Sequence, residues 1–352
     1  MADDTRTEGH GSAPPPCPHP GVIPWAPLSV GDILGGALTT MRRYGKHLLG
    51  IGVIAYGTVA VAVIAGYGIA YEAGLLNGLL DAEQPGEGPT ATLALIGVGA
   101  IAAIGLLLAT ATVCTASATV LQEAIVGRPI GWAELWHRTL ERLPSVTMTV
   151  LVSGLLLAIP AGLFGVAALV ALFSLLEGDG KVSPLVPSAL LIALVLAGPA
   201  FWLAVRFSLA PAVAVFERQS AATALRRSSL LVRGVWWRTF GIALLALLVA
   251  SAVALLLRLM LNAVRMLPGE AGEVLDTGSD PSFAAALIGY GPLLLLGVLG
   301  QLIHQMLITV LPQLALGVLY VDRRLRTEQL GPALAAAAMT RADDTDRIRS
   351  GT

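Results

Sequence analysis

The sequence predicts an all-α integral membrane protein, a polytopic bundle of six transmembrane helices in three hairpins with amphipathic elbows on the cytoplasmic side. With 55% hydrophobic residues, 13% charged residues and a mean hydropathy of +0.77, the chain is too apolar for a soluble domain. Six apolar stretches reach the roughly 20 residues that a hydrocarbon core of about 30 Å requires. Lys and Arg are concentrated in alternate connections between those stretches.

Both ends of the chain are predicted to be cytoplasmic tails. Residues 1–28 are rich in Pro and small polar residues, which favours disorder. No charged start leads into an apolar core, so no cleaved signal peptide is expected. His10, Cys17 and His19 are the candidates for a metal cluster in this tail, but flexible Pro-rich tails that bind nothing are much commoner. Residues 331–352 are expected to form a short helix or a disordered tail.

The ordered part is expected to begin at Ser29, which has the S-x-x-D spacing of a helix-capping box with Asp32. Apolar residues then recur at helical spacing on one face as far as Lys46, with charged residues largely elsewhere. This pattern predicts an amphipathic lead-in to the first span. Two similar segments follow, a second elbow from Glu123 to Pro144 and a third from Ser220 to Arg238.

The elbows separate six predicted spans. These are Leu48–Tyr71, Ala91–Leu121, Ser145–Leu176, Pro184–Phe216, Phe240–Leu257 and Ser282–Val321. Small residues at four-residue spacing in the first and third spans predict close helix packing. They are Ala62, Gly66, Ala70, Gly154, Ala158 and Gly162. Pro160 predicts a kink in the third span.

One face of the second span carries polar side chains, namely Thr112, Thr115, Thr119 and Gln122. We expect these groups to form hydrogen bonds with neighbouring carbonyls, since unpaired polar groups are costly within a bilayer. The alternative is that they line a pathway across the membrane.

Each hairpin is predicted to repeat one order of parts: a lead-in, a first span, an acidic outer loop and a second span that ends at an acidic residue. These acidic residues are Glu123, Glu217 and Asp322. Residues 29–330 are therefore interpreted as one transmembrane domain of three parallel repeats, of about 29–126, 127–217 and 218–330. The alternative is that any even-numbered bundle looks repetitive when it is reduced to hydropathy.

Basic residues predict the orientation in the membrane. Of the 22 Lys and Arg residues, nearly all lie in the elbows and termini, whereas the other three loops hold only Lys181, Arg258 and Arg265. By the positive-inside rule, the elbows and both the N and C termini are expected to be cytoplasmic.

Three stretches carry a family resemblance: PGVIPWAPLSVGDILGGALTTMRRY, RFSLAPAVAVFERQSAATALRRSSLLVRGVWWRTFGIALL and LGVLYVDRRLRTEQL. They resemble multi-pass bacterial proteins, many of them actinobacterial, that are related to the membrane domain of glycerophosphoryl diester phosphodiesterases. The resemblance covers roughly Pro20 to Leu330 and implies a location in the bacterial cytoplasmic (plasma) membrane. In the enzymes that name the family, catalysis resides in a separate soluble barrel. Such a barrel needs about 250 residues, and about thirty follow the sixth span here, so no phosphodiesterase activity is expected.

A candidate lipid- or partner-binding surface lies in the third elbow. It comprises Arg226, Arg227, Arg233, Trp236, Trp237 and Arg238. On a continuous helix Arg226 and Arg233 share a face with Ser229, and Trp rings are suited to the headgroup level. The plainer explanation is that these arginines only determine the topology.

A candidate intramembrane polar site comprises Arg206, Gln301, His304 and Gln305. Arg206 is expected at the cytoplasmic boundary, where its guanidinium can reach water. The i, i+3, i+4 spacing of the other three places them on one face of the sixth span, which Thr309 extends. An interhelical hydrogen-bond cluster and a solute or proton path are both consistent with such a face.

These features favour a non-catalytic membrane protein that organises lipids or partner proteins at the inner membrane surface. A transporter or permease for a small solute, using the polar face of the sixth span, is the alternative. The sequence has no phosphate loop and no H-E-x-x-H, G-x-S-x-G or paired Cys-x-x-Cys motif. We therefore expect no enzyme activity, cofactor or metal. Membrane lipids and other membrane proteins are the expected partners, and nucleic acid is not.

Overall fold

The computed structural model describes residues 28–75, 88–126, 130–176, 185–265 and 283–327. Within these ranges all regular secondary structure is helical, and six helical segments are long and apolar enough to cross a membrane. The chain is therefore a multi-pass helical membrane protein, as the sequence predicts. Apart from Leu28, both predicted tails, including His10, Cys17 and His19, lie outside the described residues. Leu28 falls within the predicted disordered tail, but it is buried and bonded to Asp322.

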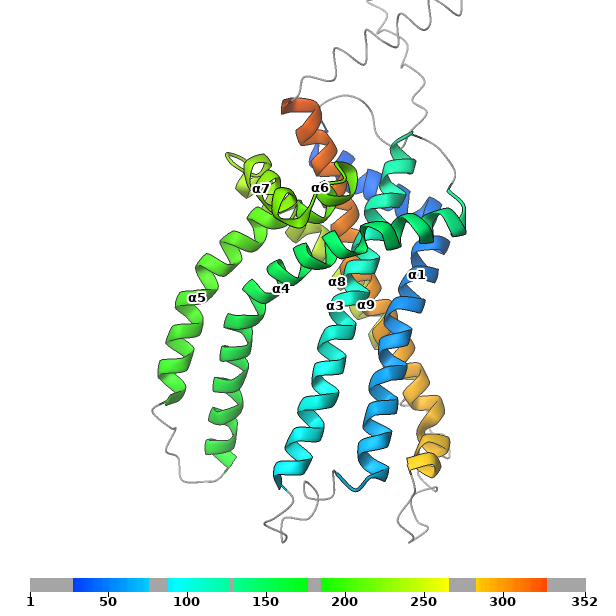
Figure 1. The fold of residues 1–352 in the computed structure, drawn as a ribbon, viewed down its shortest axis with the longest axis vertical. Coiled ribbons are helices and arrows are strands. Elements are labelled where there is room, and N and C mark those ends of the chain that lie inside the picture. The colour runs from blue at the N-terminus through cyan, green and yellow to red at the C-terminus, as the bar shows by residue number, and fades with distance from the viewer. Residues whose placement is uncertain (1–27, 76–87, 127–129, 177–184, 266–282, 328–352) are drawn as a thin grey trace, which may run out of the picture.

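The long helices pair as three hairpins. α1 (Val30–Glu72) pairs with α3 (Gly88–Val126), α4 (Trp132–Leu176) with α5 (Leu185–Phe207), and α8 (Trp236–Arg265) with α9 (Phe283–Thr327). Two short helices, α6 (Ala210–Phe216) and α7 (Ala221–Leu231), connect the second hairpin to the third (Figure 1). The predicted arrangement of six spans in three hairpins is confirmed.

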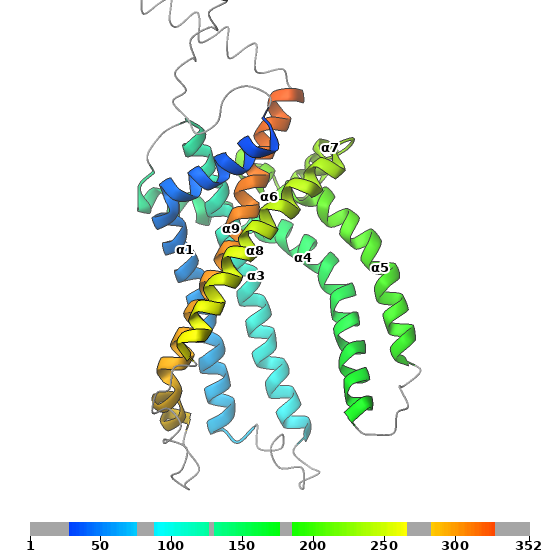
Figure 2. The same cartoon turned by 180° about the vertical axis from the view of Figure 1, so that it is seen from behind.

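The amphipathic segments gather at one end of the molecule, which we call the elbow end. The first turns of α1 and α4 run across the bundle before each helix bends down it, and α7 lies at the same end (Figures 1 and 2). The Ser29 hydroxyl accepts from the Asp32 N–H at 3.2 Å, and the Asp32 carboxylate accepts from the Ser29 N–H at 2.9 Å. The predicted capping box is confirmed. Hydrogen bonds from the Ser29 hydroxyl and backbone hold the pKa of the Asp32 carboxyl below its usual value.

The three lead-in helices bury corresponding positions. Counted from the residue before each helix, which is Ser29, Gly131 or Ser220, the fourth and eighth following residues are fully buried in all three. They are Ile33, Ala37, Leu135, Thr139, Ala224 and Ser228. A spacing of four places both positions on one helical face. The shared register agrees with a threefold repeat, although the repeat boundaries stay a prediction.

The hydrophobic core lies toward the elbow end, where the last turns of the second spans meet. α3 contacts both α6 and α9 there, and α6 also contacts α9. Gly317 of α9 allows a close approach, because a Cβ at this position would lie 2.5 Å from Cδ2 of Leu121. Nearer the opposite end many large apolar side chains are exposed, as on a surface that faces lipid.

The fourth span is not the continuous helix that the sequence predicts. α5 ends at Phe207, and α6 begins at Ala210 with Pro211 in its first turn. Proline lacks the N–H that a continuing helix would use and is favoured at the start of a new one. The chain therefore breaks where hydropathy alone shows an unbroken apolar run.

The third elbow is shorter than predicted, because α7 ends at Leu231 and a turn follows. Gly234 in this turn has φ +83°, a left-handed conformation that glycine adopts without strain. Arg233 consequently lies beyond α7 and does not share a helical face with Arg226. Trp236–Arg238 form the first turn of α8 instead of the elbow.

The predicted close packing at small residues is confirmed at one position in α1 and wrong at two positions in α4. Gly66 of α1 packs against α3 as predicted, since a Cβ there would lie 3.6 Å from Val98. Gly154 and Gly162 of α4 meet nothing within 4 Å, so the predicted close packing at these positions is wrong. A small residue permits a close approach but does not bring a neighbouring helix to it.

Candidate functional site

Acidic residues at the ends of the first two hairpins each bind the lead-in helix that follows. Arg138 Nη1 in the first turns of α4 donates to Glu123 at 2.7 Å. Arg227 Nε of α7 lies 2.6 Å from the carboxylate of Glu217. Both arginines occupy the seventh position after the residue that precedes their helix. The end of one unit is thus joined to the start of the next by a charge-assisted hydrogen bond.

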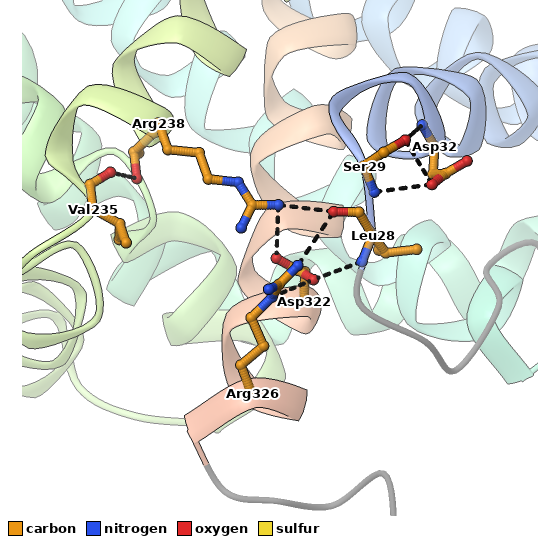
Figure 3. Close-up of polar contacts among 8 residues, drawn as sticks. Leu28, Ser29, Asp32, Val235, Arg238, Asp322 and Arg326 are labelled. Carbon is orange, nitrogen blue, oxygen red and sulfur yellow. Dashed lines mark hydrogen bonds and ion pairs between the residues drawn. The ribbon is translucent and has the colours of Figure 1, made fainter.

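Asp322 joins the end of the last unit to the start of the first. Its Oδ1 accepts from the backbone N–H of Leu28 at 3.0 Å, across a separation of 294 positions (Figure 3). Arg326 Nε donates to Oδ1 at 2.9 Å, and Arg238 Nη2 lies 3.3 Å from Oδ2. Both arginines also donate to the Leu28 carbonyl. We call Leu28, Arg238, Asp322 and Arg326 the Asp322 clasp. The Asp322 side chain is only 1% exposed, so the two arginines balance its charge inside the protein.

Further polar contacts connect the three second-span ends to one another. The buried Tyr320 of α9 donates its hydroxyl to Glu217 at 2.7 Å, so Glu217 contacts both α7 and α9. Gln122 Nε2 of α3 donates to the Val215 carbonyl of α6 at 3.4 Å. Arg227 is therefore ion-paired with the largely buried Glu217, although its own side chain is 41% exposed.

Aromatic rings of α5 and α8 gather beside α7. The Trp236 ring centroid lies 4.9 Å from that of Trp237, 5.4 Å from that of Phe240 and 6.2 Å from that of Phe201. These distances are typical of favourable aromatic pairs. Trp236 is partly buried in the cluster, whereas Trp237 is 77% exposed at its edge.

Arg206 belongs to this aromatic region. Its guanidinium lies over the Trp202 ring, 4.9 Å from the centroid, in a cation–π arrangement. The Ser228 hydroxyl of α7 donates to the Arg206 carbonyl at 2.9 Å. The structure therefore groups Arg206 with the elbow residues and not with the polar residues of α9, with which it was predicted to form one site.

The six residues of the predicted third-elbow surface divide into an ion-paired set, an exposed set and the partly buried Trp236. Arg227 and Arg238 hold internal carboxylates, whereas Arg226, Arg233 and Trp237 are exposed. With the partly buried Arg206 and Trp236, the exposed set forms what we call the aromatic–basic surface. Its members are Arg206, Arg226, Arg233, Trp236 and Trp237.

The remaining candidate intramembrane residues lie on α9. Gln301 is exposed, and His304 and Gln305 are partly buried. Nδ1 of His304 is buried without a hydrogen-bond partner among the described residues. Burial of a nitrogen without a hydrogen bond costs free energy in a membrane protein. Of the polar residues on this face, His304 is therefore the one whose polar side chain the described neighbours do not explain.

Thr309 joins a hydroxyl cluster that connects three helices. Tyr56 Oη of α1 lies 3.2 Å from Thr309 Oγ1 of α9 and 3.3 Å from Thr110 Oγ1 of α3. Thr309 also donates to the Gln305 carbonyl at 2.8 Å. Sequence analysis missed Tyr56 because an aromatic residue in an apolar run is typical of a core. The available signal was that a buried tyrosine hydroxyl needs a partner.

The hydroxyls of α3 donate to carbonyls of their own helix, four residues earlier. The donors are Thr112, Thr115, Ser117 and Thr119, at 2.7 to 2.8 Å. The prediction that the threonines of this face are bonded to nearby carbonyls is confirmed. The same bonds leave these hydroxyls less free to coordinate a permeating solute.

No family model, curated protein or solved structure matches the chain. Across the ranges that the structure describes, no three His, Cys, Asp or Glu side chains are grouped so as to hold a metal ion. The elbow end, where charged and aromatic side chains are concentrated, is the candidate functional site.

Proposed function

We propose that this chain is a non-catalytic multi-pass membrane protein that gathers anionic lipids at the inner surface of a bacterial cytoplasmic membrane, with the elbow end and both termini cytoplasmic. The observation that carries the proposal is the aromatic–basic surface, where Arg226 of α7, Arg233 of the following turn and Trp237 in the first turn of α8 are all exposed. Trp rings favour the headgroup level, and arginines at that level attract anionic headgroups. The concentration of Lys and Arg at this end supports the orientation.

Lipids fit this surface better than an acidic partner protein does. Leu230 and Trp237 are 57% and 77% exposed, so large apolar side chains accompany the two arginines. Apolar side chains that reach the acyl boundary together with cations at the headgroups are typical of interfacial helices. The alternative form of this proposal is that a partner protein binds the same arginines. The relationship to the membrane domain of glycerophosphoryl diester phosphodiesterases is also a proposal.

Transport is the second candidate, and the unpartnered Nδ1 of His304 is the observation that favours it. Against it, the neighbouring Thr309 is bonded to Tyr56 and to its own helix. Thr110 of α3 belongs to the same cluster through Tyr56. These bonds support a packing role for this part of the bundle.

The test measures lipid selectivity in proteoliposomes of phosphatidylglycerol and phosphatidylcholine. Electron paramagnetic resonance of spin-labelled lipids reports how strongly each headgroup associates with the protein. Wild type should prefer phosphatidylglycerol, and Arg226→Gln with Arg233→Gln should weaken this preference by up to about 1 kcal/mol per side chain. Added salt should also weaken it.

The control is Arg258→Gln, which removes an exposed arginine of α8 far along the helix from its elbow-end start. It should leave the preference unchanged. A wild-type protein without any preference for phosphatidylglycerol, or equal losses in the control and the elbow variant, would refute the proposal.

A further inference from the structure

An apolar groove of about 600 Å³ lies between α1, α3 and the first turns of α4. From α1 it is lined by Ile54, Thr58 and Ala62, among others, and from α3 by Ile101, Ile104 and Leu108. Trp136 and Leu140 of α4 also line it. The volume is within the usual range for small-molecule sites, and the lining is almost entirely hydrocarbon.

The groove opens toward the bilayer side of the bundle. Ile54 is 44% exposed, Ile104 61% and Leu140 47%, although all three line it. In a membrane, the molecules beside these side chains are lipids, and an apolar space open to them excludes water. The groove is thus accessible to an acyl chain without any opening of the bundle.

Two hydroxyls in the groove are already bonded. Thr58 donates to the Ala55 carbonyl at 2.9 Å, and Thr112 donates to the Leu108 carbonyl at 2.7 Å. Neither hydroxyl proton is therefore free for a polar solute. This favours a hydrocarbon occupant.

Contacts between α1 and α4 fix the end of the groove nearest the elbows. The Trp132 ring stacks on His47 with centroids 6.3 Å apart. It also rests on Gly50, where a Cβ would lie 2.7 Å from the ring. Arg43 and Lys46, one to two turns before Gly50, are exposed. Arg43 and Lys46 thus precede Ile54, the first lining residue of α1, by about two to three helical turns on the elbow side. Cations followed along the helix by an apolar lining match the order of headgroup and chain in a lipid.

We propose that this groove holds one acyl chain of an anionic phospholipid, whose headgroup lies beside Arg43 and Lys46. The site deepens the proposed function and rests on it for the orientation of the elbow end. It differs from the aromatic–basic surface because it contacts an acyl chain as well as a headgroup, so its lipid should exchange slowly and remain through detergent extraction. Each buried methylene favours retention by hydrophobic transfer.

Native mass spectrometry of the full chain, purified from phosphatidylglycerol-containing membranes, should find one retained phospholipid per chain. Ala62→Phe, which fills the groove from an exposed position, should lower the lipid-bound fraction about tenfold, the effect of withdrawing about two methylenes from apolar contact. Ala65→Phe is the matched control, because Ala65 is exposed on the same helix and does not line the groove. It should retain the lipid.

A second measurement needs no variant. A phosphatidylglycerol with a photoactivatable group midway along one chain should, after detergent washing, remain crosslinked to residues 54–62 and 101–112.

Replacing Arg43 and Lys46 together by Gln should abolish the preference of the retained lipid for phosphatidylglycerol over phosphatidylcholine.

Three results would overturn the site: no retained lipid in wild type, equal retention in the two Phe variants, or no difference between the two headgroups. Arg226→Gln with Arg233→Gln should leave the retained lipid in place. The experiments therefore test the lipid site in the groove and the aromatic–basic surface separately.

Discussion

The carboxylate of Asp322 accepts a hydrogen bond from the backbone N–H of Leu28 at 3.0 Å, so the last span is bound directly to the start of the first. Glu123 and Glu217 bind the lead-in helices that follow them, through Arg138 and Arg227. In sequence the third acid has no following repeat. In space, the start of the first hairpin takes that place, and the three hairpins form a closed ring of contacts at the elbow end.

Replacing Asp322 by Asn should destabilise the protein. The amide oxygen can still accept from Leu28, but Arg238 and Arg326 lose the charge that balances them. Loss of one partner of a buried ion pair costs about 3–5 kcal/mol; because the two arginines are 28% and 36% exposed, we expect about 1–3 kcal/mol. A lower thermal unfolding midpoint in detergent should report this loss.

The matched control is Glu141→Gln. Glu141 is 52% exposed and paired with His137, which is 75% exposed, so its removal should leave the midpoint nearly unchanged. If both variants unfold at the same temperature, the clasp does not stabilise the bundle.

Two glycines of α1 should respond differently to substitution by alanine. A Cβ on Gly52 would overlap the buried Met306 side chain, whereas a Cβ on Gly57 would meet nothing within 4 Å. Gly52→Ala should cost about 1–3 kcal/mol through overpacking. Gly57→Ala should be neutral or stabilising by roughly 0.5–1 kcal/mol, because alanine is the better helix former. The midpoint of thermal unfolding should fall for Gly52→Ala and stay the same or rise for Gly57→Ala; an equal fall in both variants would contradict this packing.

Hydropathy and charge suffice to predict the six spans, their pairing and the amphipathic elbows, because the bilayer imposes a fixed length and a strong penalty on buried charge. They do not predict where a helix breaks within an apolar run, as at Phe207, since both halves are equally apolar. They also do not predict the contact between Leu28 and Asp322, because hydropathy contains no information about which distant segments meet. The turn at Gly234 had a signal, a glycine between two patterned segments.

Tyr56 and His304 should separate packing from transport within the membrane. Tyr56→Phe removes the hydroxyl shared by Thr110 and Thr309, so the thermal midpoint should fall by the equivalent of about 1 kcal/mol. His304→Leu removes a buried nitrogen without a partner, so folded yield should be unchanged or higher. Normal yield together with loss of a solute flux present in wild-type proteoliposomes would instead favour the transporter hypothesis.

The candidate site was only partly predictable. Arg226, Arg233 and Trp237 were identified from composition and spacing, and they are exposed. Spacing could not show that Arg227 and Arg238 would be taken up by internal carboxylates, because their partners Glu217 and Asp322 are brought to them by the fold.

The central claim is that the elbow end, with its basic side chains, lies on the cytoplasmic side. Cysteine accessibility in intact cells tests it most directly, in a background where Cys17 and Cys114 are replaced. Arg233→Cys and Glu72→Cys probe exposed positions near opposite ends of the bundle. A membrane-impermeant maleimide should label Glu72→Cys in intact cells and label Arg233→Cys only after the membrane is permeabilised; labelling of Arg233→Cys in intact cells would contradict the account.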